Sequence, residues 1–266
     1  MDTRAIGVLD SGIGGLTSAK VLEEILPCED IIYFGDSRRM PYGGHTREEI
    51  CEMSLQGAAF LDSFDVKAIL LACGSISSNA AQTLRANFRT PFIGVVEAAC
   101  AAALRVTKTK RIGVIATPAT IASGVYERGL GAPGGGVTVL THACRDFARM
   151  VEEGHFRVGD SVAEREVARE LSCFRGSGID TLLLGCTHYP LLEGVIARYL
   201  GAHIRQISAG VEAAYSIAEY LRGNDMLTGS TQNGRRLWYT SGDTDSFGSS
   251  AGLFLGHHIV PEQKIL

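Results

Sequence analysis

The segments AILLAC (68–73) and TLLLGC (181–186) are two apolar runs that each end in a cysteine. Runs of this length, followed by small or polar residues and then a helical pattern, are typical of buried parallel strands that lead into a βα turn. Functional residues of open α/β sheets gather at such strand ends. Two thiols in equivalent positions therefore predict a cleft with Cys73 on one wall and Cys186 on the other.

Short apolar runs alternate with longer amphipathic stretches along most of the 266 residues. Strands that alternate with helices indicate parallel sheets built from βαβ units, so we predict an α/β fold. The predicted strands lie at residues 6–9, 31–34, 68–72, 92–95, 112–116, 137–140, 182–184, 204–207 and 237–240.

An internal repeat indicates two similar halves. IGVLDS (6–11) resembles IGVIAT (112–117), 106 positions later, and Cys186 follows Cys73 by a nearly equal 113 positions. We predict a first α/β domain at 1–97 plus 208–266, and a second at 98–207. The glycine-rich stretch 129–136 predicts a flexible surface loop. In the tail, Asp243 is the predicted N-cap of a helix.

The composition excludes several classes of protein. The net charge of −4 supplies no basic field for nucleic acid, and no apolar stretch approaches the roughly 20 residues of a membrane helix. We therefore expect a cytoplasmic protein. Seven cysteines without a CxxC pair indicate free thiols. Zinc held by Cys186 and His188, together with His142 and Cys144, is conceivable, but the spacings match no standard site, so we expect neither metal nor cofactor.

The segment DSGIGGL (10–16) follows the first predicted strand and opens a helix. Its glycines let the backbone approach a ligand, and helix N-terminal amides favour a carboxylate. The GxGxxG template fails at Thr17, which argues against a dinucleotide site. Asp10, at the strand end, can accept a proton or orient a thiol or an ammonium group.

The segments that follow the cysteines also carry polar groups. In CGSISSN (73–79), a helix N-terminus should lower the pKa of the Cys73 thiol, and the serines could hold a carboxylate. In GCTHYP (185–190), His188 could tune Cys186 or bind a substrate carboxylate. The alternative is that each cysteine is a buried packing residue. The turn-rich loop 36–44 can cover a cleft. The pair Glu152-Glu153 is expected to lie at a solvent-exposed helix end.

Taken together, these motifs resemble the glutamate racemase family, within the cofactor-independent aspartate and glutamate racemases. The resemblance covers nearly the whole chain. It is carried by DSGIGGL (10–16), YFGDSRRMPYG (33–43), LAC (71–73), PFIGVVE (91–97), VEEGH (151–155), GCTHYPLL (185–192) and TSGD (240–243).

The resemblance implies two pseudo-symmetric parallel-sheet α/β domains that enclose glutamate in the cleft between them. It implies Cys73 and Cys186 as acid and base without pyridoxal phosphate, assisted by Asp10 and His188, with Glu152 near the second thiol. It also implies a homodimer that supplies D-glutamate for peptidoglycan. The implied substrate contacts are Asp10, Ser11, Pro41, Tyr42, Gly43, Gly74, Ser75, Thr187 and His188.

One departure from the family pattern leaves the substrate open. Members usually have Asn and Thr after the first cysteine, where this chain has Gly74 and Ser75. Losing an amide donor costs about 1–3 kcal/mol, or roughly 5- to 150-fold, unless Asn79 or a water replaces it. Gly74 could also enlarge the pocket for aspartate or another acidic amino acid. A weakly active binding or regulatory protein is the third hypothesis.

Overall fold

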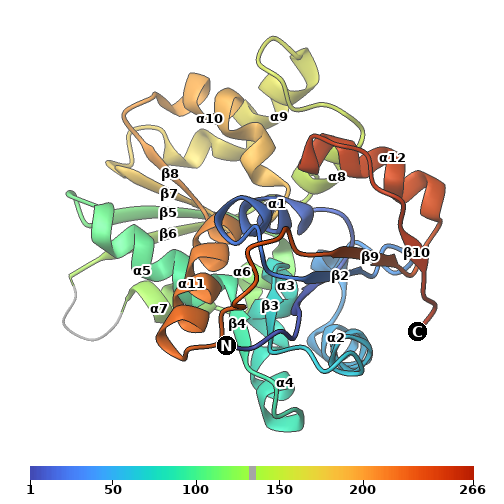
Figure 1. Ribbon diagram of the computed structural model, residues 1–266. Coiled ribbons are helices and arrows are strands. Elements are labelled where there is room, and N and C mark those ends of the chain that lie inside the picture. Colours follow the sequence, from blue (N-terminus) through green and yellow to red (C-terminus); the bar gives the residue numbers. More distant parts are fainter. Residues whose placement is uncertain (132–135) are drawn as a thin grey trace.

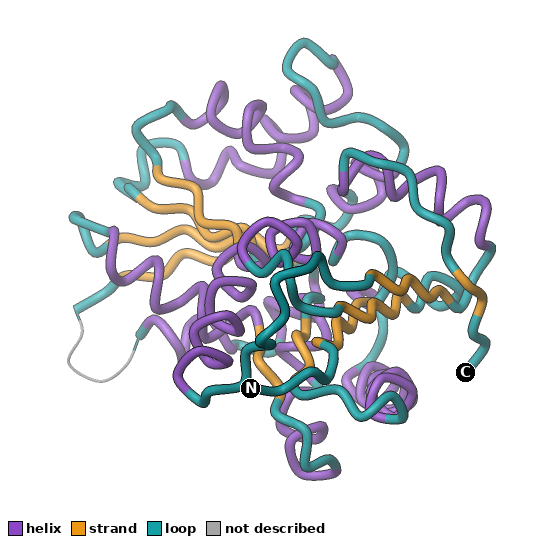
Figure 2. Tube along the Cα trace, viewed as in Figure 1, coloured by secondary structure: helices purple, strands orange, loops and turns teal. Residues whose placement is uncertain are grey.

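The computed structural model describes residues 1–131 and 136–266, and it contains two open parallel sheets (Figure 1, Figure 2). The first sheet has the strand order β10 (Glu262–Gln263), β9 (Arg236–Thr240), β2 (Ile31–Gly35), β1 (Ile6–Asp10), β3 (Ala68–Leu71) and β4 (Phe92–Gly94). The second has the order β6 (Thr138–Ala143), β5 (Arg111–Ala116), β7 (Thr181–Leu184) and β8 (Arg205–Ser208).

The two sheets repeat one topology. The order β2-β1-β3-β4 recurs as β6-β5-β7-β8, with parallel pairing throughout. Both the predicted fold class and the internal repeat are thereby confirmed. All nine predicted strands are present. The strand that was missed, β10, has two exposed polar residues and therefore no apolar signal.

Helices cover the sheets because parallel strands are buried on both faces. In the first part of the chain they are α1 (Leu16–Ile25), η1 (Tyr42–Gly44), α2 (Arg47–Asp62), α3 (Gly74–Asn79), α4 (Ala81–Asn87) and α5 (Val95–Val106). Around the second sheet they are α6 (Pro118–Ala122), α7 (Val125–Leu130), α8 (Phe147–Glu152), α9 (Ser161–Glu170), η2 (Leu171–Phe174), η3 (Tyr189–Leu192) and α10 (Glu193–Leu200). The last two are α11 (Ala209–Gly223) and α12 (Thr244–Leu255).

Local sequence signals explain where several helices begin. Asp243 caps α12 as predicted, because its side chain accepts from the backbone N–H of Ser246 at 2.7 Å. A capping box formed by Thr46 and Glu49 starts α2. Half of the predicted loop at 129–136, positions 132–135, lies outside the described residues, and its first two positions belong to α7. Among the described helices, none is both long and apolar enough to cross a membrane.

The two sheets are joined through α5 and α11, which pack against each other. The chain passes from the first sheet to the second through α5 and returns through α11 (Figure 1). One apolar core cluster continues from the first sheet through these helices into the second. The predicted boundaries near 97 and 208 fall at these two crossings, and the exact division remains a prediction.

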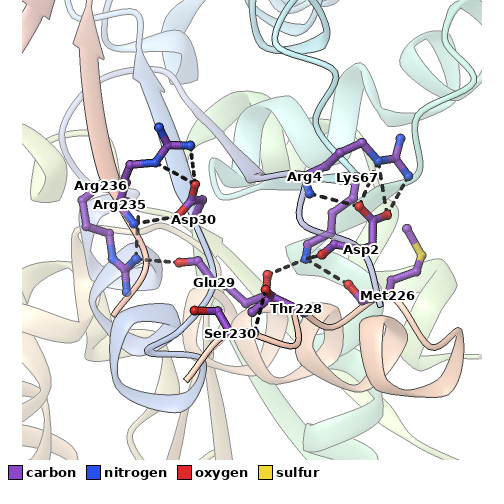
Figure 3. A network of polar contacts seen from close by, with 10 residues as sticks. All are labelled: Asp2, Arg4, Glu29, Asp30, Lys67, Met226, Thr228, Ser230, Arg235 and Arg236. Atoms are coloured by element: carbon purple, nitrogen blue, oxygen red, sulfur yellow. Dashed lines mark hydrogen bonds and ion pairs between the residues drawn. The ribbon is translucent and has the colours of Figure 1, made fainter. Parts of the chain in front are cut away.

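A buried ion pair closes the amino end of the first sheet (Figure 3). Lys67, just before β3, pairs with Glu29 and donates to the carbonyls of Asp2 and Met226, each at 2.9 Å. Glu29 also accepts from the backbone N–H of Thr228 at 2.7 Å. The network ties the chain segments together at the end of the sheet opposite the cysteines, and leaves the carboxyl ends free for a site.

Candidate active site

The carboxyl ends of β1 and β3 in one sheet face those of β5 and β7 in the other. In each sheet this is where the strand order reverses, the position at which open α/β sheets bind ligands. A cavity of only about 20 Å³ lies between the two ends. It is lined by Ser11, Pro41, Tyr42, Gly43, Cys73, Gly74, Ser75, Thr117, Ala148, Gly185, Cys186, Thr187 and His188.

The structure brings the predicted residues together. Every expected substrate contact except Asp10 lines this cavity, and both cysteines are buried there. Sequence reasoning missed Thr117, Ala148 and Gly185. A signal for Thr117 existed, because it occupies the position of Ser11 when IGVLDS is aligned with IGVIAT.

Cys73 lies at the N-cap of α3 and donates to the hydroxyl of Ser11, with 3.3 Å between Sγ and Oγ. Burial and then the Asp10 carboxylate raise the pKa of this thiol to about 12. The predicted lowering of the Cys73 pKa is therefore wrong. The short helix α3 contributes one backbone donor, from Ile76, and this is outweighed by the loss of water around the thiol.

Cys186 has a different partner. Its Sγ lies 3.7 Å from Nδ1 of His188, and Nε2 of His188 lies 2.8 Å from Oε1 of Glu152. Burial opposes the charged imidazolium, but the hydrogen bonds with Cys186 and Glu152 outweigh it and raise the pKa of His188 to about 10. We expected both glutamates at the end of this helix to be exposed to solvent. This holds for Glu153, whereas Glu152 is partly buried and contacts His188.

Asp10 lies just behind the cavity and is 1% exposed. Its Oδ2 accepts from the backbone N–H of Gly12 at 3.0 Å, while its Oδ1 has no partner among the described residues. Burial raises the pKa of this carboxyl. A buried acceptor without a donor is costly, so Oδ1 is suited to an ammonium group or to a transferred proton.

The loop 36–44 covers the cavity, as the sequence predicted, and Asp36 anchors it. The Asp36 carboxylate accepts from the hydroxyl of Tyr42, from Nε of Arg39 at 2.7 Å and from the hydroxyl of Ser241 at 2.5 Å. These bonds hold Pro41, Tyr42 and Gly43 against the site. The loop is therefore fixed by a buried carboxylate that does not itself line the cavity.

Two glycines allow the sheets to approach closely. A Cβ at position 74 would overlap the carbonyl oxygen of Gly185, and a Cβ at position 14 would overlap the side chains of Thr187 and His188. Gly74 therefore does not enlarge the pocket, because the backbone of the opposite domain fills the space. Nor does Asn79 replace a lost amide, since its Nδ2 donates to the carbonyl of Ser75 and the hydroxyl of Ser78.

A larger cavity, of about 560 Å³, opens beyond α3 between α2 and α4 on one side and α6 and α7 on the other. It contains neither cysteine and neither Asp10 nor His188, so it is separate from the site. Among the described residues, one group of close metal-type donors occurs, and its members also lie outside the cysteine cavity: His142, Cys144 and Glu170.

The Asp/Glu/Hydantoin racemase family model matches residues 19–214. The chain is 38% identical to a protein of Geobacter metallireducens named glutamate racemase, over 96% of this chain and 94% of that protein. The structure of glutamate racemase isoform RacE1 from Bacillus anthracis superposes with a TM-score of 0.94 at 36% identity, over 100% of this chain and 99% of that one. The structure of glutamate racemase from Francisella tularensis, in complex with D-glutamate, superposes with a TM-score of 0.92 at 36% identity, over 99% of this chain and 98% of that one.

This chain belongs to the Asp/Glu/hydantoin racemase family and is therefore an isomerase. Within that family, relatives that are 36–39% identical to it over nearly their whole length are named glutamate racemase. The resemblance carried by the sequence motifs is thereby confirmed.

Proposed function

We propose that this protein interconverts L- and D-glutamate by proton transfer between Cys73, Cys186 and the α-carbon, without pyridoxal phosphate. One observation carries the proposal. Two buried thiols occupy matching strand ends of two facing sheets and line one small cavity. A carbon atom held between them presents opposite faces to the two sulfur atoms.

The lining can hold an amino acid by its charged groups. The free Oδ1 of Asp10 accepts from the substrate ammonium, since a buried carboxylate oxygen needs a donor. The hydroxyls of Ser11, Ser75, Thr117 and Thr187 donate to the carboxylates. These donors also stabilise the negative charge that develops when the α-proton leaves.

In one direction, Cys186 acts as the base and Cys73 as the acid. His188 holds the Cys186 proton, and Glu152 stabilises the imidazolium that results. The Cys186 thiolate takes the α-proton, and the Cys73 thiol gives its proton to the opposite face of the carbon. Cys73 is then a thiolate, so the reverse reaction runs with the roles exchanged.

The cleft must open to admit the substrate. A cavity of about 20 Å³ is close to the room that a single water requires, far below that of glutamate. We infer that the two domains separate for binding and close for chemistry, which excludes water and strengthens every polar contact to the reacting carbon.

The cellular role follows from the same assignment. Relatives that are 36–38% identical to this chain are named glutamate racemase, and one of them is known in complex with D-glutamate. We infer that the protein is cytoplasmic, acts as a homodimer and supplies D-glutamate for peptidoglycan.

A second candidate keeps the reaction and changes the substrate to aspartate or another acidic amino acid. The observation behind it is Gly74, where the family's amide is missing and the Gly185 carbonyl fills the space. A closer approach of the two domains suits a shorter substrate. A purely binding or regulatory role is disfavoured, because both thiols keep their hydrogen-bonding partners.

Hydrogen exchange separates these candidates. The purified protein is incubated with each enantiomer of glutamate and of aspartate in D₂O, without pyridoxal phosphate, and α-deuteration and circular dichroism are followed. Deuteration and loss of optical rotation with glutamate are expected. Exchange with aspartate alone would select the second candidate, and no exchange with any of the four would contradict both.

A further inference from the structure

A group of three different metal-type donors lies at the carboxyl end of β6, the edge strand of the second sheet, and outside the cysteine cavity. His142 is near the end of β6, Cys144 follows that strand directly, and Glu170 is the last residue of α9. One ligand atom from each residue lies within 4.8 Å of the other two. The sequence already offered His142 and Cys144, two positions apart, but Glu170 lies 26 positions after Cys144, so no local motif marks the complete group.

We propose that His142, Cys144 and Glu170 form a binding site for a zinc-like divalent transition metal. Imidazole, thiolate and carboxylate are the three ligand types that zinc takes in proteins. Tetrahedral donors at zinc bond lengths of about 2.0–2.3 Å stand roughly 3.3–3.7 Å apart. The three atoms therefore need only small side-chain movements to enclose an ion.

The three donors are largely buried, which distinguishes the group from a cluster of surface side chains. Cys144 is 1% exposed, the Glu170 side chain 13% and the His142 side chain 33%. The ring of His142 rests edge-on against Phe174, with 6.4 Å between the ring centroids, which limits its rotation. One side of the group is thus closed by the protein, and the partly exposed histidine leaves a fourth position to water.

Metal binding replaces contacts that now hold the group together. Nε2 of His142 lies 2.6 Å from Oε2 of Glu170, while the other carboxylate oxygen pairs with Arg169 at 2.7 Å. The ion would take the place of the proton shared by His142 and Glu170, and Cys144 would release its thiol proton to solvent. Arg169 can stay on Oε1, where it orients the carboxylate as an outer partner.

The site would act as a clasp within the second domain, because it links the end of β6 to the end of α9. It also touches the active-site wall, since the hydroxyl of Tyr189, next to His188, donates to the carbonyl of Cys144 at 3.0 Å. The proposal does not depend on racemase turnover. Its test can therefore fail or succeed independently of the proposed function.

Cobalt is the probe, because tetrahedral Co²⁺ bound to a thiolate gives a charge-transfer band and intense visible bands. The full-length Cys73→Ser/Cys186→Ser double variant is titrated with Co²⁺ and then with Zn²⁺, since the active-site thiols are themselves possible ligands. We expect one Co²⁺ per chain with these bands, displacement by Zn²⁺, and a thermal midpoint that rises with Zn²⁺.

Single substitutions then locate the ion. In the double-variant background, His142→Gln, Cys144→Ser and Glu170→Gln should each weaken binding by at least about tenfold, as even outer partners of metal ligands cost about 10–100-fold. Cys144→Ser should also remove the charge-transfer band. The matched controls are Glu164→Gln, a position of α9 that pairs with Arg198 and not with Arg169, and Cys100→Ser, a buried thiol elsewhere; neither should change affinity.

The result that overturns the site is direct. Absence of the thiolate band, or a band that persists in Cys144→Ser, contradicts it. Because Cys144 is buried and its variant can lose stability, the half-buried positions provide a second check. Unchanged affinity in both His142→Gln and Glu170→Gln would equally rule out the site.

Discussion

Cys73 and Cys186 occupy equivalent places in two repeated sheets but have opposite surroundings. Cys73 contacts a serine hydroxyl and lies near a carboxylate, and its pKa is raised to about 12. Cys186 contacts a histidine that a glutamate supports. A duplicated backbone therefore presents two thiols symmetrically, while the side chains around them differ, with a hydroxyl and a carboxylate near Cys73 and an imidazole beside Cys186.

The difference arises at positions that correspond in the repeat. Asp10 at the end of β1 aligns with Ala116 at the end of β5, so the carboxylate exists on one side only. Ser75 lies two residues after Cys73, as His188 lies two residues after Cys186. Two exchanges in the aligned halves are thus enough to give the cysteines different hydrogen-bonding partners.

Removing either thiol should have the largest effect. Cys73→Ser and Cys186→Ser are each expected to lower kcat for racemisation by about 10²–10⁴-fold, the range for loss of a general acid or base. Each variant keeps one thiol, which faces one side of the α-carbon. Each should therefore still exchange the α-hydrogen of one glutamate enantiomer for deuterium, and the two variants should act on opposite enantiomers. Exchange of the same enantiomer by both variants would contradict opposed thiols. Cys100→Ser serves as the control.

The next effect tests the acceptor beside Cys186. Glu152→Gln should lower kcat by about 10- to 150-fold, since a hydrogen bond to a charged group is worth about 1.5–3 kcal/mol. Glu153→Gln, at the exposed neighbouring position, should leave kcat unchanged. Equal effects of the two substitutions would break the comparison.

The same variant makes a prediction about pH. The pKa of His188 is raised to about 10 from an ordinary value of 6.5, so the stabilisation from its proton is complete below about pH 6.5 and lost as the pH rises through about 10. Removing the Glu152 carboxylate lowers this pKa. The alkaline fall in the free energy of unfolding should therefore begin at lower pH in Glu152→Gln, as measured by urea titrations across the pH range.

A smaller effect is expected on the side of Cys73 where the domains meet. Gly74→Ala adds only a Cβ, which would overlap the Gly185 carbonyl, and overpacking of this kind costs about 1–3 kcal/mol. We expect kcat/KM to fall by about 5- to 150-fold. Gly74→Asn should fall at least as far; an increase in its activity would mean that the closed cleft described here is not the catalytic arrangement.

The smallest effect should come from the weak partner of Cys73. Ser11→Ala removes the hydrogen bond that Cys73 donates, worth about 0.5–1.5 kcal/mol, so kcat should fall roughly 2- to 10-fold. The loss of the Ser11 contact with the substrate carboxylate should appear separately, as a rise in KM. A loss as large as that in Glu152→Gln would show that the two thiols depend equally on their partners, and the asymmetry would then need another origin.

Much of the fold could be predicted because its signals are local. The apolar runs at 68–72 and 182–184 form strands, as their residue pattern alone predicts. Asp243 caps a helix by accepting from the backbone N–H of Ser246, only three residues later. The motifs GCTHYPLL and DSGIGGL likewise placed Cys186 and Asp10 at strand ends. The edge strand β10 escaped prediction since two exposed residues carry no pattern.

The electrostatics of the site could not be predicted in the same way. The N-cap position of Cys73 was visible, but its pKa depends on burial and on Asp10, more than sixty positions away. The role of Gly74 depends on a carbonyl from the other sheet. Glu170 joins His142 and Cys144 only because α9 ends beside β6.

The sequence by itself determined the two α/β halves, the pair of strand-end cysteines and the family, since periodicity and short motifs act over neighbouring residues. Only the tertiary structure decided how closely the halves approach, which charges reach each thiol and which distant donors meet. Those properties depend on distance and solvent exposure through space, and both are set after the chain has folded.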